Sequence, residues 1–133
     1  MSQEIVLVVD DSPIELLGCR RALEQAGFQV VTYHIKEFSE VFKLSEIVML
    51  ERPHVILMDV NLGLSAYDGA RLATAMRKLR EVDSKTPLIV LHSSMSEDEL
   101  KQVQANCGAD AFLEKGKLEQ LPNRVRMVLM RCL

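Results

Sequence analysis

Short runs of consecutive apolar residues recur along this chain and alternate with stretches in which apolar residues return every three or four positions. Uninterrupted apolar runs are typical of strands buried on both faces, and the wider spacing is typical of helices with one buried stripe. The pattern therefore predicts five strands alternating with five helices. The expected strands are residues 4–11, 28–33, 54–59, 87–91 and 111–113.

Residues that favour helix ends mark where the expected helices begin and stop. Ser12 followed by Pro13 supplies an N-cap and a proline at the first helical position. Ser96 precedes a first turn with three acids, which suit the positive end of a helix. Gly27 and Gly108 are placed to end these two helices.

The second expected helix covers residues 37–51. Ile47 and Leu50 lie off the expected stripe, so this helix should show some apolar surface. The stripe itself is expected to contain Phe38, Val41, Phe42, Ser45, Val48 and Met49.

Alternating strands and helices, with strands that lack a polar face, imply a parallel sheet covered by helices on both sides. Right-handed crossover connections leave few topologies for such a chain. At 133 residues, a single domain spanning residues 1–133 is long enough to bury a sizeable core. We therefore expect the α/β class, with a doubly wound five-stranded parallel sheet.

Composition excludes several classes of protein. The apolar fraction of 48% argues against disorder, and no apolar run approaches the roughly 18 residues of a membrane span. The net charge of −3 comes with scattered basic residues, so no direct nucleic-acid binding is expected. The first residues lead straight into a strand with no basic segment before it, so no signal peptide and a cytoplasmic location are expected.

Three cysteines, Cys19, Cys107 and Cys132, are widely spaced and form no CxxC motif. Cys19 and Cys107 fall on the inner faces of expected helices. Small buried thiols, with neither a disulfide nor a metal role, are therefore the preferred interpretation.

Five polar residues fall at the expected carboxyl ends of strands: Asp10, Asp11, Asp59, Ser93 and Lys115. Parallel sheets of this class bind ligands at that edge, beside the point where the strand order reverses. If the first and third strands are neighbours, three carboxylates converge and repel one another unless a cation lies between them. Mg²⁺ suits such a site, because it accepts carboxylate oxygens and keeps positions for water and phosphate.

Each of these residues also has a purely structural interpretation. The Asp10–Asp11 pair could serve a helix N-terminus, Lys115 could be a solvated loop lysine, and Ser93 could cap a helix. Taken together, the five positions suit transfer of a phosphoryl group to a carboxylate nucleophile, with metal and lysine stabilising the transferred charge.

The sequence resembles a response-regulator receiver domain of bacterial two-component signalling over essentially its whole length, as a stand-alone domain. The segments that carry the resemblance are residues 8–13, 52–59, 68–69, 87–91 and 108–115. The resemblance implies a flavodoxin-like (βα)5 fold with strand order 2-1-3-4-5.

The resemblance also implies a role for each residue of the site. Asp59 would be the phosphoacceptor, and Lys115 would contact the phosphoryl group. Asp11 and Asp59 would ligate Mg²⁺ through their side chains, Asn61 through its backbone carbonyl and Asp10 mostly through water. The switch residues would be Ser93 and Phe112, the aromatic residue turning inward as the hydroxyl moves toward the phosphate.

A sensor histidine kinase or a phosphotransfer protein would be the donor, and the protein would not be an enzyme in the usual sense. Phosphorylation would switch a surface formed by the last two helices and the last strand, offered to a downstream protein or to a second copy in a homodimer. The alternative is a pseudo-receiver adaptor that binds partners independently of phosphorylation.

Three features depart from the usual pattern of the family. The Met-Pro that usually follows the phosphoacceptor is absent, and the loop to Asp68 is about two residues longer. Gly116 replaces the usual proline after Lys115, so a trans peptide bond is expected there. Counting back from Lys115 selects Ser93 as the hydroxyl position, the preferred assignment, whereas counting on from Pro87 selects His92.

Overall fold

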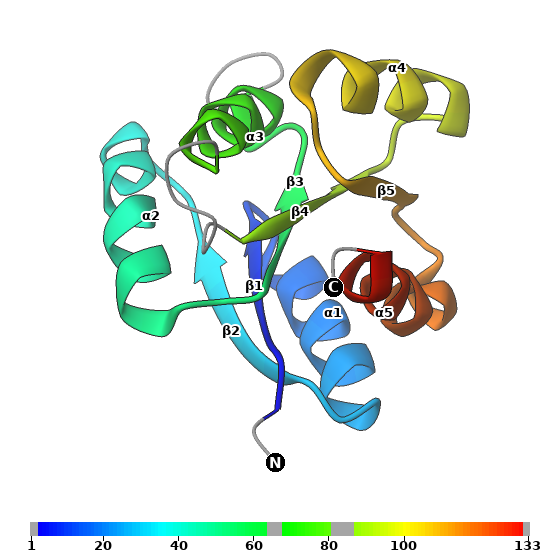
Figure 1. The fold of residues 1–133 in the computed structure, drawn as a ribbon. Coiled ribbons are helices and arrows are strands. Elements are labelled where there is room, and N and C mark those ends of the chain that lie inside the picture. Colours follow the sequence, from blue (N-terminus) through cyan, green and yellow to red (C-terminus); the bar gives the residue numbers. More distant parts are fainter. Residues whose placement is uncertain (1–2, 64–67, 81–86, 132–133) are drawn as a thin grey trace.

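The fold is that of a computed structural model, which describes residues 3–63, 68–80 and 87–131, without the side chains of residues 38, 41, 42 and 79. Strands and helices alternate along the chain, and a short 3₁₀ helix precedes the last helix (Figure 1). The elements are β1 (Ile5–Asp10), α1 (Pro13–Gln25), β2 (Gln29–His34), α2 (Phe38–Glu51), β3 (Val55–Asp59), α3 (Asp68–Leu79), β4 (Leu88–Ser93), α4 (Glu97–Cys107), β5 (Ala111–Glu114), η1 (Leu118–Gln120) and α5 (Leu121–Arg131).

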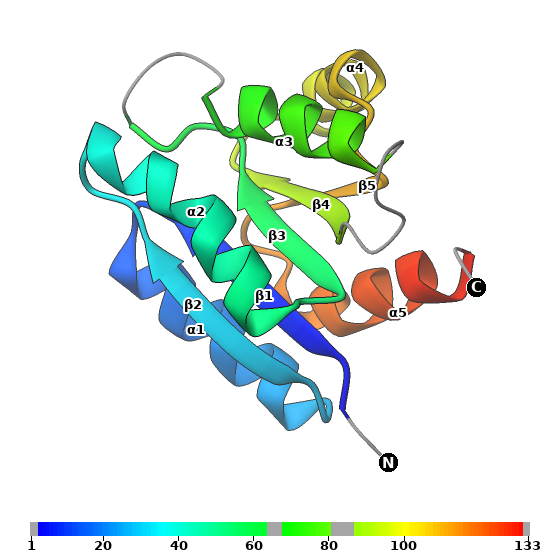
Figure 2. The ribbon, with the colours of Figure 1, turned by 60° about the vertical axis from the view of Figure 1, so that its left-hand side comes forward.

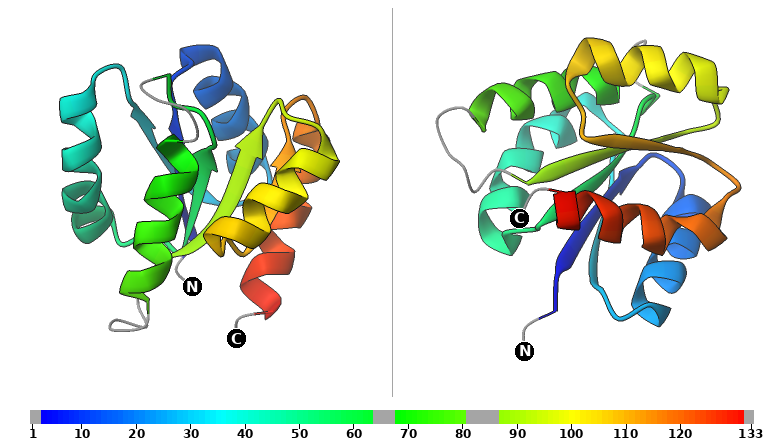
Figure 3. Two further views of the ribbon diagram at one scale, coloured as in Figure 1. Left: turned by 90° about the horizontal axis from the view of Figure 1, so that it is seen from above. Right: turned by 45° about the vertical axis from the view of Figure 1, so that its right-hand side comes forward.

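The five strands form one parallel sheet in the order β2-β1-β3-β4-β5, which confirms the predicted topology. Helices α1 and α5 cover one face of the sheet, and α2, α3 and α4 cover the other (Figure 2). The strand order reverses between β1 and β3, so the carboxyl ends of these two central strands lie side by side. In the left panel of Figure 3, which is the view of Figure 1 seen from above, the arrowheads of the strands point toward this edge at the top of the picture.

Two apolar clusters hold the helices to the sheet, one on each face. Alternate residues of each strand enter opposite clusters because successive side chains point to opposite faces. On β4, Ile89 and Leu91 belong to the cluster beneath α2, α3 and α4, while Val90 belongs to the cluster beneath α1 and α5. Both clusters are needed because a parallel sheet has no face that water can solvate favourably.

The helix boundaries expected from the sequence are confirmed at both helices with a serine cap. The side-chain oxygens of Ser12 and Ser96 accept hydrogen bonds from the backbone N–H groups of Glu15 and Glu99. Gly108 caps α4 in the left-handed conformation, with φ of 76°. Cys19 and Cys107 are buried as free thiols, whereas Cys132 lies outside the described residues.

The core stripe expected for α2 was right at Val48 and wrong at Ser45 and Met49. The side chains of its other members, Phe38, Val41 and Phe42, lie outside the described residues. Leu44 is buried and Ile47 and Val48 pack against the core, whereas Ser45 and Met49 are exposed. The buried residues follow the i, i+3, i+4 spacing from Leu44, so the helix is rotated relative to the expected stripe. Of the two residues expected to form apolar surface, Leu50 is 80% accessible to solvent, whereas Ile47 packs against the core. Met49, expected in the core, is 76% accessible instead.

Within the described ranges, no helix is both long and apolar enough to cross a membrane.

Candidate functional site

Three carboxylates meet at the carboxyl ends of β1 and β3. One oxygen each of Asp10, Asp11 and Asp59 lies within 4.8 Å of the other two. Asp10 is 1% and Asp59 5% accessible to solvent, whereas Asp11 is exposed at the rim. The adjacency of β1 and β3 brings these side chains together, as the sequence pattern predicted.

Lys115, one residue beyond the end of β5, completes the cluster with a positive charge. Its Nζ lies 3.1 Å from Oδ2 of Asp10 and 3.0 Å from Oδ2 of Asp59. The other carboxylate oxygens accept backbone hydrogen bonds, Oδ1 of Asp10 from Ser12 and Oδ1 of Asp59 from Asn61. Each buried carboxylate is therefore held by one backbone donor and one shared ammonium group.

Burial and mutual repulsion work against full ionisation of this cluster. Burial raises the pKa of Asp59 to about 7, and the charge of Asp10 adds to this rise against the opposing effect of Lys115. The pKa of Asp11 is raised as well, first by burial and then by the neighbouring Asp10. Burial alone would lower the pKa of Lys115, but its contacts with Asp59 and Asp10 outweigh this and raise it. One ammonium group does not offset three carboxylates, so the cluster favours a further cation.

The two candidates for the hydroxyl position point to opposite faces of β4. Ser93 is buried on the side of Leu91 and Phe112, where its Oγ accepts a hydrogen bond from the backbone of Met95. His92 is buried on the side of α1, against Cys19. Ser93 and Phe112 therefore share one side of the sheet, as a pair acting together requires. His92 lies on the opposite side of the sheet from this pair.

The start of α3 approaches the end of β3 closely. A Cβ atom on Gly69 would lie 1.7 Å from the backbone oxygen of Asp59, so only glycine fits there. Asp68 is buried and accepts hydrogen bonds from the backbone N–H groups of Leu62 and Gly69. Asn61, two residues beyond the end of β3, is exposed, and its backbone N–H donates to Oδ1 of Asp59.

The turn after β5 has the trans peptide bond that the sequence predicts before Gly116. None of the described residues has a cis peptide bond, so Lys115 and Gly116 are joined in trans. Gly116 adopts φ of 91°, which a glycine reaches without strain. The backbone N–H of Lys115 donates to the Ser93 carbonyl at 2.7 Å, so the turn keeps the lysine beside β4.

Comparison with known proteins decides the family. The family model described as response regulator receiver domain matches residues 6–126. The chain belongs to this family. It is 34% identical over 113 residues to a gliding motility regulatory protein of Myxococcus xanthus; the match covers 85% of this chain but only 13% of that relative.

Solved receiver structures are similar over nearly the whole chain. Chemotaxis protein CheY4 of Vibrio cholerae shares 25% identity with a TM-score of 0.77, covering 96% of this chain and 99% of that one. A DrrB receiver domain described as BeF3-activated shares 26% identity with a TM-score of 0.73, covering 97% and 99%. The chain is therefore a receiver domain of the two-component response-regulator type, a signalling domain.

Receiver domains bind Mg²⁺ in an acidic pocket, and the donor set of this receiver fits that ion. Asp10, Asp11 and Asp59 offer only hard carboxylate oxygens, the ligands that Mg²⁺ takes in proteins. Asp11 is accessible to solvent, so the ion could keep several of its waters.

Sequence reasoning missed two contacts that shape the receiver site. Nε2 of His34 donates a hydrogen bond to the backbone carbonyl of Asp11 at 3.0 Å, from the end of β2. Gly63, at φ of 85°, lies so close to Asp11 that a Cβ atom would be 3.0 Å from its Oδ2. The only sequence signal for these contacts was the position of His34 at a strand end and of Gly63 in an unusually long loop.

Proposed function

We propose that this receiver accepts a phosphoryl group on Asp59 in a Mg²⁺-dependent reaction and thereby switches a protein-interaction surface. The single observation that supports this most strongly is the convergence of Asp10, Asp11, Asp59 and Lys115 from three different strand ends. A structural role for each acid alone would not require all four groups in one cluster.

In the proposed reaction, a carboxylate oxygen of Asp59 attacks phosphorus. The bond from phosphorus to the donor breaks as the new O–P bond forms, and the donor leaves with the electron pair of the broken bond. The donor would be the phosphohistidine of a sensor histidine kinase or phosphotransfer protein, or a small acyl phosphate. When bound at the three carboxylates, Mg²⁺ would supply positive charge that offsets the charge of the entering phosphoryl oxygens.

The protein residues around Asp59 have distinct roles in this proposal. The Asn61 N–H on Oδ1 and the ammonium group of Lys115 on Oδ2 hold the carboxylate in place before reaction. After transfer, Lys115 is close enough to contact the phosphoryl group. Asp10 and Asp11 would hold the ion together with Asp59 and the backbone carbonyl of Asn61. Ser93 would then exchange its present contact with Met95 for a phosphoryl oxygen.

The output surface is proposed to lie over α4, β5 and α5. Phe112 and Arg124 line a shallow groove of about 300 Å³ there, beside Met127, which is 47% exposed. Nη1 of Arg124 donates a hydrogen bond to the Phe112 carbonyl at 2.7 Å, which ties α5 to the strand that carries the switch aromatic. A rotation of Phe112 would therefore change this surface, which would bind a downstream protein or a second receiver.

The test is incubation with acetyl phosphate and Mg²⁺, followed by intact-mass analysis. The expected result is a gain of one phosphoryl group that requires Mg²⁺ and is absent in Asp59→Asn. Asp98→Asn, which alters an exposed acid at the start of α4, is the matched control and should be phosphorylated normally. No gain of mass in the unmodified receiver, or an equal gain in Asp59→Asn, would contradict the proposal and favour a phosphorylation-independent adaptor.

A further inference from the structure

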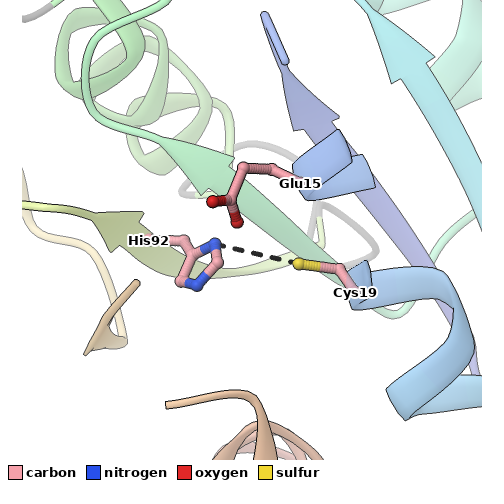
Figure 4. A group of neighbouring side chains, drawn as sticks. All are labelled: Glu15, Cys19 and His92. Atoms are coloured by element: carbon pink, nitrogen blue, oxygen red, sulfur yellow. Dashed lines mark hydrogen bonds between the residues drawn. The ribbon is translucent and has the colours of Figure 1, made fainter. Parts of the chain in front are cut away.

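A second group of ligand-type side chains lies beside the acidic cluster, on the face of the sheet covered by α1. Glu15 and Cys19 extend from α1 toward His92 of β4, and the three side chains converge on one point (Figure 4). One ligand atom of each lies within 4.8 Å of the other two. Glu15 and Cys19 are one helical turn apart, so both face β4. The proposed phosphoryl transfer uses none of these three residues.

The burial of this group is unusual for its chemistry. Cys19 is 0% and His92 1% exposed, while Glu15 is half-buried and opens the cluster to solvent. The neighbours of His92 on this face, Val90 and Leu113, are apolar, so packing alone does not require an imidazole. Nε2 of His92 is buried and has no hydrogen-bond partner among the described residues. Burial has removed water from the His92 ring, and the one contact that its nitrogens gain is the long one between Nδ1 and the Cys19 thiol.

The donors of this group differ from those of the acidic cluster. A thiolate, an imidazole and one carboxylate are the ligands of Zn²⁺ and similar transition-metal ions, whereas Mg²⁺ and Ca²⁺ take oxygen ligands. The Cys19 Sγ and His92 Nδ1 atoms lie 3.9 Å apart. Tetrahedral Zn²⁺ with ordinary bond lengths holds such a pair about 3.6 Å apart, so an adjustment of a few tenths of an ångström suffices.

We propose that Glu15, Cys19 and His92 form a Zn²⁺ site that is distinct from the acidic phosphoacceptor site. The Cys19 thiolate and the Glu15 carboxylate together balance the two positive charges of Zn²⁺, and His92 adds a neutral imidazole. The occupied site therefore has no net charge, which lowers the cost of burying it. Water from the side of Glu15 fills the fourth position.

Binding is an exchange of a proton for a metal ion at Cys19. Burial raises the pKa of this thiol to about 12, so the free receiver carries S–H at neutral pH. As the S–Zn bond forms, the S–H bond breaks and one proton is released to solvent. The ion then joins α1 to β4 one residue before Ser93, while Lys115 stays paired with Asp10 and Asp59.

The test is titration of the metal-free receiver with Co²⁺ in excess Mg²⁺, which occupies the acidic site. The expected result is thiolate-to-cobalt charge-transfer absorption with the bands of four-coordinate Co²⁺, both lost on addition of Zn²⁺. The chain has three cysteines, so a Cys107→Ser, Cys132→Ser double variant leaves Cys19 as the only thiol and should keep the full signal. Cys19→Ser and His92→Val should lose it, with folding checked by far-ultraviolet circular dichroism.

Several outcomes would overturn the Zn²⁺ site. These are absence of the charge-transfer band in the unmodified receiver, its absence in the double variant, or its persistence in Cys19→Ser. Weak absorption from octahedral Co²⁺ alone, lost in Asp11→Asn, would show binding only at the acidic site. Glu15→Gln, at a partly exposed position, should weaken Zn²⁺ binding at least tenfold, and unchanged affinity would exclude the three-ligand site. These readouts do not depend on phosphorylation, so the proposed function can fail or succeed separately.

Discussion

The ammonium group of Lys115 lies 3.0 Å from Oδ2 of Asp59, yet this ion pair leaves the carboxyl with a pKa of about 7. Burial and the neighbouring Asp10 disfavour the charged form more than one shared lysine favours it. The closely spaced carboxylates therefore favour the binding of a cation, and they lower the stability of the receiver when no metal is bound.

Asp59→Asn should stabilise the receiver at high pH in the absence of Mg²⁺. The folded-state pKa of about 7 lies above the usual value of 3.8, so the folded form binds the proton more tightly. Stability therefore falls as pH rises from about 4 to about 7, and the substitution removes this loss. We expect a gain in free energy of unfolding on the order of 1–3 kcal/mol at pH 8, and almost none near pH 4.

Urea unfolding of Asp59→Asn and of the unmodified receiver, from about pH 4 to about pH 8, measures the difference in their free energies of unfolding. Asp98→Asn is the control, and adding Mg²⁺ should narrow the difference between Asp59→Asn and the unmodified receiver. A variant less stable than the unmodified receiver at pH 8 would show that the Lys115 ion pair outweighs the cost of burial.

Gly69→Ala should be destabilising because the close approach to Asp59 involves backbone atoms. The new Cβ would lie 1.7 Å from the Asp59 oxygen, so β3 or α3 must move. We expect a loss of about 3 kcal/mol in the free energy of unfolding, with slower phosphorylation. Gly18→Ala is the matched control: its Cβ would meet only the end of the Leu118 side chain at 3.2 Å, and its stability should stay within about 1 kcal/mol. Equal stability of the two variants by urea unfolding would contradict this prediction.

Ser93→Ala should slow phosphorylation without much loss of stability. If Ser93 donates one hydrogen bond to a phosphoryl oxygen, its removal should cost about 1–1.5 kcal/mol in the transition state, or roughly tenfold in rate. A time course of mass gain with acetyl phosphate measures this rate. Ser96→Ala should show the opposite pattern, because Ser96 caps α4: a loss of about 1 kcal/mol in stability with an unchanged rate. An unchanged rate in Ser93→Ala would remove this residue from the proposed mechanism.

Arg80→Ala should destabilise the opposite edge of the sheet. Nη1 and Nη2 of Arg80 contact the two carboxylate oxygens of Asp110 at 2.9 and 2.8 Å, with only 16% of the arginine side chain exposed. Oδ2 of Asp110 also accepts from the backbone N–H of Ile89, so this pair joins the end of α3 to the starts of β4 and β5. We expect a loss of about 2–3 kcal/mol, little changed by salt.

The control for Arg80 is Arg20, whose side chain pairs with Glu24 on the surface of α1 and is 47% exposed. Arg20→Ala should cost less than about 0.5 kcal/mol, because solvent screens the pair. Similar losses in the two variants would show that the bidentate contact at Arg80 contributes no more than a surface pair.

The fold and the acidic cluster could be predicted because local patterns determine both. The apolar runs specify the strands, and a polar residue at the end of a parallel strand must lie at one edge of the sheet, so Asp10, Asp59 and Lys115 were found together. The stripe on α2 was predicted only in part, because apolar residues lie all around that helix, and only packing against the sheet selects Leu44 over Met49.

The group around His92 could not be found from the sequence. His92 and Cys19 are 73 positions apart, and no spacing rule for metal ligands joins them. Only the packing of α1 on the face of the sheet that the His92 side chain enters brings them together. The same holds for His34 and Asp11, which meet because β1 and β2 are neighbours in the sheet.

Ser93 and His92 are consecutive residues on β4 that project to opposite sides of the sheet. At the end of this strand the Ser93 hydroxyl therefore lies on the side of the sheet that carries Phe112, and the His92 imidazole lies on the side covered by α1. Insertion or deletion of a single residue before His92 within β4 would exchange the two, placing an imidazole on the side of Phe112 and a hydroxyl beside the thiol. The register of this strand therefore decides which of the two side chains reaches the acidic edge from each face of the sheet.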